Sequence, residues 1–133
     1  MGEPAGIGGE IALAAWRALH EDPAAQPFFL IDDPARLRRL AAASGIDTPL
    51  AEIGAAAEAA GQFASALPVL PLELPAVVRP GQPDPANASA VIAAIERAVA
   101  LVQGGEAAAL VTNPIHKRTL YQAGFEFPGH TEY

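Results

Sequence analysis

Polar residues near the end of the chain have the types and spacing to bind a small anionic molecule. Asn113 and Lys117 lie four positions apart, and His130 and Thr131 follow a Pro-Gly pair. An ammonium group can hold a phosphate or carboxylate as a point charge, and amide, imidazole and hydroxyl groups can orient such a ligand through hydrogen bonds. We therefore take Asn113, Lys117, His130 and Thr131 as candidate substrate-binding residues.

Each of these residues also has an ordinary structural explanation. Asn113 could cap a helix, Lys117 could be a solvated side chain, and a histidine after glycine is often only a structural hydrogen-bonding group. The three histidines, at positions 20, 116 and 130, lack the close spacing of metal ligands, so we predict no metal site built inside the chain. The residues alone leave the alternatives open and assign neither a catalytic nor a cofactor-binding side chain.

A glycine-rich turn occupies the N-terminus, over residues 1–9. Its backbone N–H groups could approach an anion at the start of a helix, because glycine allows close approach and the helix dipole favours negative charge. The turn lacks the Gly-Lys-Ser/Thr of a phosphate-binding loop and the third glycine of the dinucleotide fingerprint. A tight structural turn is the favoured interpretation. Since such a loop ordinarily follows a strand, we expect an opening strand to be missing.

Hydrophobic periodicity predicts that helices and strands alternate along the chain. We expect a helix over 10–19 whose apolar face contains Ile11, Ala14, Ala15 and Ala18 and is widened by Trp16 and Leu19. We also expect a strand over 28–31, a helix over 34–44 between an Asp33 cap and a Gly45 stop, a helix over 88–103 and a strand over 107–112. This order is typical of an α/β fold with a mostly parallel sheet and flanking helices.

Prolines dominate the region between Thr48 and Pro85. Because proline donates no backbone hydrogen bond, we expect no long helix and no interior strand there. Short extended pieces over 51–53 and 76–78 are the most that this region should contain.

Composition limits the class of protein. The 133 residues, of which 51% are hydrophobic, suffice for one domain or part of one, and the net charge of -7 argues against a nucleic-acid partner. Arg36, Arg38 and Arg39 are the nearest approach to a basic patch, and we interpret them as a solvated helix face. The absence of cysteine fits a reducing cytoplasm. Neither a leader nor a membrane-spanning apolar run is expected, so we predict a soluble cytoplasmic protein without a membrane partner.

Three segments, in the right order, carry a family resemblance. Residues 1–11 (MGEPAGIGGEI) resemble the opening GDPAGIGPE of 4-hydroxythreonine-4-phosphate dehydrogenases, although Glu3 and Gly9 stand where that pattern has aspartate and proline. Residues 110–117 (LVTNPIHK) are similar to the family's VTxPIxK segment, and residues 125–133 (FEFPGHTEY) to its FxGHTEF/Y segment. The resemblance implies that residues 1–133 are the N-terminal portion of such a dehydrogenase, without its opening strand and its C-terminal half.

The resemblance implies a specific reaction. Members of this family carry out the NAD-dependent oxidation of 4-hydroxythreonine 4-phosphate and its decarboxylation, in pyridoxal 5'-phosphate biosynthesis. They act as homodimers with an isocitrate or isopropylmalate dehydrogenase type of fold, here incomplete. They require a divalent metal such as Zn, Mg or Co, whose histidine ligands would lie beyond Tyr133. By position, His130 and Thr131 match the family's substrate-binding pair, and Asn113 and Lys117 fall in the neighbouring loop.

Two alternatives remain open at this point. Related family members oxidise other substrates, including phosphorylated four-carbon sugar acids and aromatic cis-dihydrodiols, and no residue here decides among them. The isolated chain could also be a truncated, non-catalytic remnant that at most binds a phosphorylated ligand or a partner chain.

Overall fold

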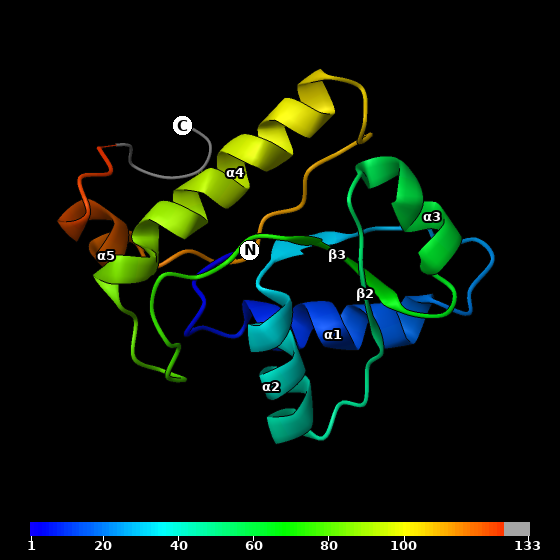
Figure 1. Ribbon diagram of the computed structural model, residues 1–133, viewed down its shortest axis with the longest axis horizontal. Helices are drawn as coiled ribbons and strands as arrows, with labels where there is room; N and C mark the ends of the chain where they lie inside the picture. The colour runs from blue at the N-terminus through cyan, green and yellow to red at the C-terminus, as the bar shows by residue number, and fades with distance from the viewer. Residues whose placement is uncertain (127–133) are drawn as a thin grey trace.

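A parallel three-stranded sheet forms the centre of the molecule (Figure 1). The computed structural model describes residues 1–126. Its strands are β1 (Leu30–Asp32), β2 (Leu50–Glu52) and β3 (Leu67–Pro71), in the order β1-β3-β2. Leu30 pairs with Val69 on one side of β3, and Leu50 pairs with Leu67 on the other. The expected α/β fold with a mostly parallel sheet is confirmed.

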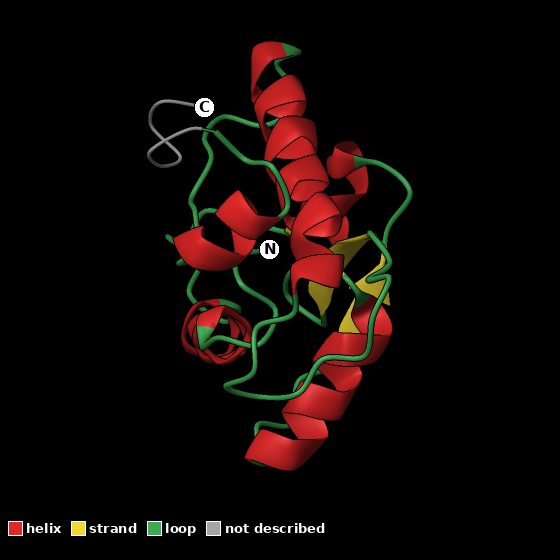
Figure 2. Cartoon of the chain, turned by 90° about the vertical axis from the view of Figure 1, so that its left-hand side faces the viewer, coloured by secondary structure: helices red, strands yellow, loops and turns green. Residues whose placement is uncertain are grey.

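Helices cover both faces of this sheet (Figures 1 and 2). The helices α1 (Gly8–Leu19) and α2 (Pro34–Ser44) lie on one face, and α4 (Ala88–Gln103) lies across the other. The remaining elements are short: η1 (Ala56–Glu58), α3 (Ala59–Gln62), η2 (Pro85–Asn87) and α5 (Lys117–Gln122). The result is a helix–sheet–helix arrangement, the usual way for a parallel sheet to bury both faces.

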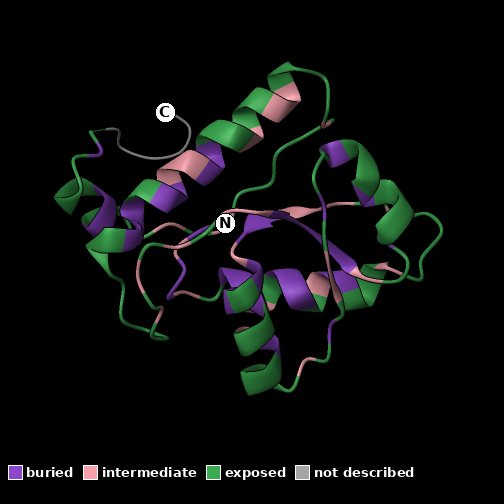
Figure 3. Cartoon of the chain, viewed as in Figure 1, coloured by how far each residue is buried: buried purple, intermediate pink, exposed green. Residues whose placement is uncertain are grey.

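Alternate residues of β3 belong to the two halves of the core. Val69 packs with Leu13 and Trp16 on the α1 side, whereas Leu70 packs with Ala94 on the α4 side. The period of two along a strand produces this division. In Figure 3 the buried residues concentrate on the sheet and on the helix faces turned toward it.

The central strand β3 contradicts the prediction that prolines exclude an interior strand. Leu67 and Val69 bond to β2, because Leu67 N donates to Pro49 O at 2.8 Å and Ile53 N donates to Val69 O at 2.9 Å. By alternation, Pro68 faces β1, one residue before that pairing begins at Val69. Pro71 faces β2, beyond the last paired residue of that strand. Neither missing N–H is required by a ladder, so this sequence can form a central strand.

The helix α1 begins two residues earlier than expected, and its buried face shares only Trp16 with the expected one. Leu13 and Trp16 are buried, whereas Ile11 is 47% exposed and Ala14 is exposed. The Trp16 indole Nε1 donates to Phe63 O at 2.8 Å, a partner 47 residues away. Two apolar faces compete on this helix, and the one with the larger side chains wins because it buries more area.

The ends of α2 agree with the prediction. The Asp33 side chain accepts a hydrogen bond from Arg36 N at 2.9 Å, Pro34 occupies the first turn, and Gly45 ends the helix with φ 64°. A carboxylate cap and a left-handed glycine are local signals, readable without the rest of the fold. The buried position of Arg36 was not predicted, since it was assigned to a solvated face.

Residues 107–112 do not form the expected strand. This segment runs from the far end of α4 back to the N-terminal turn, and Val111 is 92% exposed (Figure 1). No backbone hydrogen bond pairs residues 108–112 with any other part of the chain between residues 1 and 126. An apolar sequence alone does not make a strand, because a strand needs a neighbouring backbone. Residues 76–78 are likewise irregular, while the piece predicted over 51–53 corresponds to β2.

By length and composition, one helical stretch, Pro85–Gln103, could cross a bilayer, with 19 residues and a mean hydropathy of 1.3. It comprises η2 and α4, and it buries Ala88, Val91 and Ala94 against the core. Arg97, in its second half, donates to Pro71 O at 3.1 Å. These contacts make it a helix that covers the sheet.

Candidate functional site

The N-terminal turn packs directly on the loop that contains Asn113. Glu3 N donates to Pro114 O at 2.8 Å. A Cβ atom on Gly2 would lie 2.5 Å from Pro114 O, and one on Gly8 would lie 2.9 Å from the Asn113 Cβ. Real Cβ contacts are longer, so only glycine fits at these two positions. Two motifs separated by more than 100 residues in sequence therefore meet in one place.

The glycines of this turn serve packing of the chain against itself. Gly6 N donates to Glu3 O at 3.0 Å, and the Glu3 carboxylate accepts from Ala5 N at 3.0 Å. A Cβ atom on Gly9 would lie 2.4 Å from Leu40 Cδ2. Protein atoms thus take the space beside Gly2, Gly8 and Gly9 that an anion or a dinucleotide would need. The structure supports the interpretation as a structural turn, and the turn does not fit NAD.

The buried side chain of Arg36 is hydrogen-bonded to the N-terminal turn. The Arg36 guanidinium donates to Pro4 O from Nε at 3.1 Å and from Nη2 at 2.8 Å, and its Nη1 donates to both Asp32 oxygens at 3.0 and 3.2 Å. Arg36 and Asp32 are only 5% and 4% exposed. The guanidinium therefore joins the end of β1 to the N-terminal turn, which in turn contacts Asn113 and Pro114.

Burial shifts the pKa of Asp32, the partner of Arg36, and that of the neighbouring Met1 amino group. Desolvation raises the pKa of Asp32, and the Arg36 guanidinium and the Met1 amino group oppose that rise. Burial also lowers the pKa of the Met1 amino group, while Asp32 acts in the opposite direction. Desolvation is the largest cause in both cases, as expected where charges leave water.

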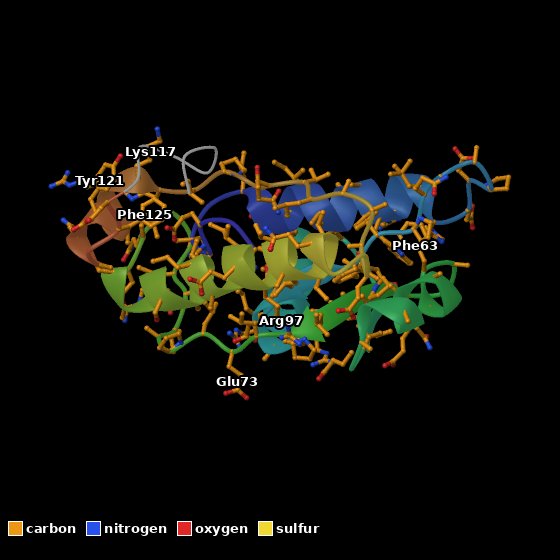
Figure 4. All side chains as sticks on the ribbon, turned by 90° about the horizontal axis from the view of Figure 1, so that it is seen from above. Phe63, Glu73, Arg97, Lys117, Tyr121 and Phe125 are labelled. Atoms are coloured by element: carbon orange, nitrogen blue, oxygen red, sulfur yellow. The ribbon has the colours of Figure 1, made fainter. Side chains whose placement is uncertain are left out.

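The helix α5 holds the other end of the loop. Leu120 and Phe125 are buried against Val91 and Ile95 of α4, and Ile115 packs beside them. Figure 4 shows Lys117 and Tyr121 at the end of the molecule formed by α5. Both ends of residues 113–117 are thus fixed by packing, one by the N-terminal turn and one by α4.

The polar groups of Asn113 and Lys117 make no contact that stabilises the described part of the fold. The N-cap of α5 is His116, so Asn113 does not cap this helix. Within residues 1–126, the Asn113 amide makes no side-chain hydrogen bond and the Lys117 ammonium makes no ion pair. Asn113 is half-buried and Lys117 is exposed. Both groups are therefore available to a ligand.

Sequence reasoning missed a polar contact inside the same loop. The His116 Nδ1 atom is hydrogen-bonded to the Thr119 hydroxyl, and Thr119 is 3% exposed. Residues three apart at the start of a helix can make this contact, so the spacing was a usable signal.

The predicted pair His130 and Thr131 lies outside the described residues. Two surface hollows are lined by none of residues 113–117, one beside α2 between Arg38 and Thr48 and one along residues 76–85. Within residues 1–126, no group of three or more His, Asp or Glu side chains could hold a metal ion. The described residues therefore do not fit a divalent metal by themselves.

Comparison with known proteins decides the family. The family described as "Pyridoxal phosphate biosynthetic protein PdxA" matches residues 24–133. The chain belongs to the PdxA family. This match covers the loop of Asn113 and Lys117 and all three strands of the sheet.

Two curated relatives of the chain have the same name. It is 47% identical over 133 residues to a 4-hydroxythreonine-4-phosphate dehydrogenase of Xanthobacter autotrophicus, covering 100% of this chain and 37% of that protein. It is 50% identical over 135 residues to the dehydrogenase of the same name from Methylorubrum populi, covering 100% of this chain and 38% of the relative. The PdxA-family chain thus spans less than two fifths of the length of these relatives.

Solved structures of 4-hydroxythreonine-4-phosphate dehydrogenases resemble the fold of this chain. A 4-hydroxythreonine-4-phosphate dehydrogenase from Klebsiella pneumoniae matches 99% of this chain and 41% of its own, with a TM-score of 0.77 and 32% identity. The protein of that name from Burkholderia phymatum gives a TM-score of 0.79 at 29% identity over 99% of this chain and 40% of its own. The fold of this chain is therefore that of part of a PdxA dehydrogenase.

Proposed function

We propose that this chain supplies one wall of the substrate site of an NAD-dependent 4-hydroxythreonine-4-phosphate dehydrogenase, acting in pyridoxal 5'-phosphate biosynthesis. One observation carries the proposal for the described residues. The Asn113–Lys117 loop is clamped at both ends, yet its amide and ammonium groups have no partner among residues 1–126. Fixed donors that the fold does not use are what a phosphorylated ligand needs.

In this proposal the chain's own residues bind and orient the substrate. Lys117 contributes a positive charge beside the phosphate, and Asn113 donates or accepts a hydrogen bond that fixes orientation. His130 and Thr131 complete the binding set by their match to the family motif. The placement of residues 1–133 in the N-terminal portion of a longer enzyme belongs to the same proposal.

The remaining parts of the proposal rest on family membership. They are the cofactor NAD, which would accept a hydride, a divalent metal with ligands outside this chain, a homodimer and a cytoplasmic location. Neither a nucleic-acid nor a membrane partner is proposed.

The second candidate is that the 133 residues alone bind a ligand without turning it over. The exposed apolar segment that contains Leu110 and Val111 favours it, because such a surface is normally covered in a complete domain. A family member acting on another phosphorylated substrate, such as a four-carbon sugar acid, is an alternative for the complete enzyme.

The test measures NADH formation at 340 nm with 4-hydroxythreonine 4-phosphate, NAD and a divalent cation. The 133-residue chain is assayed alone and as a chimera that replaces the matched region of the Xanthobacter relative. We expect activity in the chimera, and turnover by the chain alone would exclude the second candidate. An inactive chimera that is folded would contradict the proposal.

Variants of the chimera assign the loop. Lys117→Met should raise KM about tenfold, and Asn113→Ala several-fold, because each removes one polar contact to the substrate. Arg39→Met removes an exposed cation on α2 and serves as the matched control. Equal effects of Lys117→Met and Arg39→Met would show that only net charge matters.

A further inference from the structure

His116 is a polar residue of the loop to which the family motif gives no role. Its side chain is exposed beside Lys117, and its ring is oriented by the buried Thr119 hydroxyl, which bonds to Nδ1. The Nε2 atom has no hydrogen-bond partner among residues 1–126. The ring is thus held on one side and open on the other.

The direction of the His116–Thr119 bond follows from burial. Thr119 is 3% exposed, and its hydroxyl proton has no acceptor other than His116 Nδ1 within the described part of the chain. A buried hydroxyl that leaves its proton without an acceptor is unfavourable, because it has lost its hydrogen bonds to water. The hydroxyl therefore donates and Nδ1 accepts, which places the proton of the neutral imidazole on Nε2.

His20 supplies the opposite case in the same chain. Its Nδ1 faces the carbonyl oxygen of Ala64 at 3.1 Å, and its ring stacks on Trp16. A carbonyl only accepts hydrogen bonds, so His20 must carry its proton on Nδ1. The two imidazoles are therefore held in opposite tautomers by their neighbours.

The charge around His116 favours an anion. Residues 107–125 contain no Asp or Glu and include the cations Lys117 and Arg118, in a chain whose net charge is -7. Lys117 and Arg118 are both exposed. Glu126 follows this segment and Glu3 bonds to Pro114, but the Glu3 carboxylate accepts a hydrogen bond from Ala5 N within its own turn. The two exposed cations are therefore the charges that the segment itself offers to an anionic ligand.

We propose that His116 is a further substrate-binding residue, whose Nε2–H donates to a phosphate oxygen of the ligand held by Lys117, and that Thr119 is the positioning residue that fixes its tautomer. This inference rests on the proposed function, because it takes the ligand to be phosphorylated. A fixed N–H donor orients a phosphate oxygen, whereas an ammonium attracts the phosphate without fixing its orientation.

The test uses the 133-residue chain itself, labelled with 15N, and inorganic phosphate as the probe. Long-range imidazole 1H–15N spectra at about pH 8, where a free imidazole is mostly neutral, report which nitrogen carries the proton. We expect His116 to be protonated on Nε2 and His20 on Nδ1. Phosphate should shift the His116 and Lys117 signals and leave those of His20 unchanged, relative to chloride at the same ionic strength.

Two substitutions of Thr119 separate positioning from packing. Thr119→Val keeps the shape without the hydroxyl, so His116 should become a mixture of tautomers and phosphate binding should weaken about threefold to tenfold. Thr119→Ser keeps the hydroxyl and should retain the wild-type tautomer and affinity. A His116 proton on Nδ1, or no phosphate-dependent shift at His116, would overturn the proposal.

This outcome is independent of the enzyme assay. An inactive chimera together with a phosphate shift at His116 would contradict the proposed dehydrogenase function and support His116 as a binding residue. An active chimera without that shift would remove His116 from the site and keep the function.

Discussion

The position of the N-terminal turn depends on the guanidinium group of Arg36. It reaches Pro4 and Asp32 with all of its nitrogen atoms, in a place from which water is excluded. Burying two charges is expensive, and the expense is offset only while both partners are present with their hydrogen bonds. The two side chains therefore act as a unit, and removing one has a different effect from replacing both.

We predict that Arg36→Met destabilises the chain by about 3–5 kcal/mol at neutral pH, because it leaves the Asp32 carboxylate buried without its cation. The double variant Asp32→Leu with Arg36→Met should recover most of this loss, since two apolar side chains need no partner. Urea unfolding followed by circular dichroism measures both. A double variant as unstable as Arg36→Met would show that the contact with Pro4, and not the unpaired charge, dominates.

The pH dependence of stability follows from the raised pKa of Asp32. A carboxyl group that holds its proton more tightly when folded adds stability below its unfolded pKa of about 3.9, and that contribution is lost as the pH rises through the folded pKa. We expect the unfolding free energy of the wild type to fall, relative to the double variant, as the pH rises from about 4. The fall should be larger and extend to higher pH in Arg36→Met, because removal of the cation raises the pKa of Asp32 further. An unfolding free energy that rises over this range, relative to the double variant, would contradict the assignment.

Sequence reasoning identified residue types at this scale better than their surroundings. Asn113 and Lys117 were predicted to bind substrate, and that role stays a prediction, although neither polar group has a partner among residues 1–126. Arg36 was predicted to be solvated, because its partner Pro4 lies 32 residues away in sequence. A side chain whose environment comes from distant sequence cannot be placed by local spacing.

At the scale of elements, the position of the Asn113 loop depends on how closely it approaches α1. Gly8 is the first residue of α1, and it touches the side chain of Asn113 at a distance that leaves no room for a methyl group. A larger side chain at position 8 must therefore displace either the helix or the loop. Both are fixed elsewhere, since α1 buries Leu13 and Trp16 and the loop bonds to Glu3.

We predict that Gly8→Ala destabilises the chain by about 1–3 kcal/mol, through overpacking against Asn113, and shifts the Asn113 amide signals in NMR spectra. Gly61→Ala is the matched control, because Gly61 lies in α3 and a Cβ atom there would meet nothing within 4 Å. The control should raise stability by about 0.4–1 kcal/mol, since alanine loses less backbone entropy on folding. Thermal unfolding compares the two. Equal effects of both substitutions would show that the contact between Gly8 and Asn113 is loose.

Elements with local end signals were predicted well, and elements defined by their neighbours were not. Asp33 and Gly45 mark the ends of α2 by their own chemistry. The strand β3 was missed because a proline is acceptable wherever its nitrogen faces no ladder, and that depends on the register with β1 and β2. The buried face of α1 was predicted correctly only at Trp16, because the burial of Leu13 depends on core residues from distant segments.

At the scale of the whole molecule, packing is uneven along the chain. The sheet and the helices on both of its faces form the core, in which Leu67 and Val69 are fully buried. Residues 108–112 cross the surface without backbone pairing among residues 1–126, although they belong to the segment 107–112 that was predicted to be a strand. Local unfolding free energy should follow this division, because a region with few buried contacts and unpaired backbone opens most easily.

Amide hydrogen exchange should therefore be fast over residues 108–112 and slow over residues 69–70. We also predict that Val111→Ser changes the unfolding free energy of the chain by no more than about 0.5 kcal/mol, because Val111 is 92% exposed. Leu70→Ala is the core comparison and should cost about 2–5 kcal/mol, since Leu70 is 2% exposed and packs beneath α4. In the chimera with the longer relative, the same Val111→Ser substitution should become costly if added sequence covers this segment. Slow exchange over residues 108–112 in the chain alone would show that the segment already pairs as a strand in solution, and the exposed surface described for it would then be wrong.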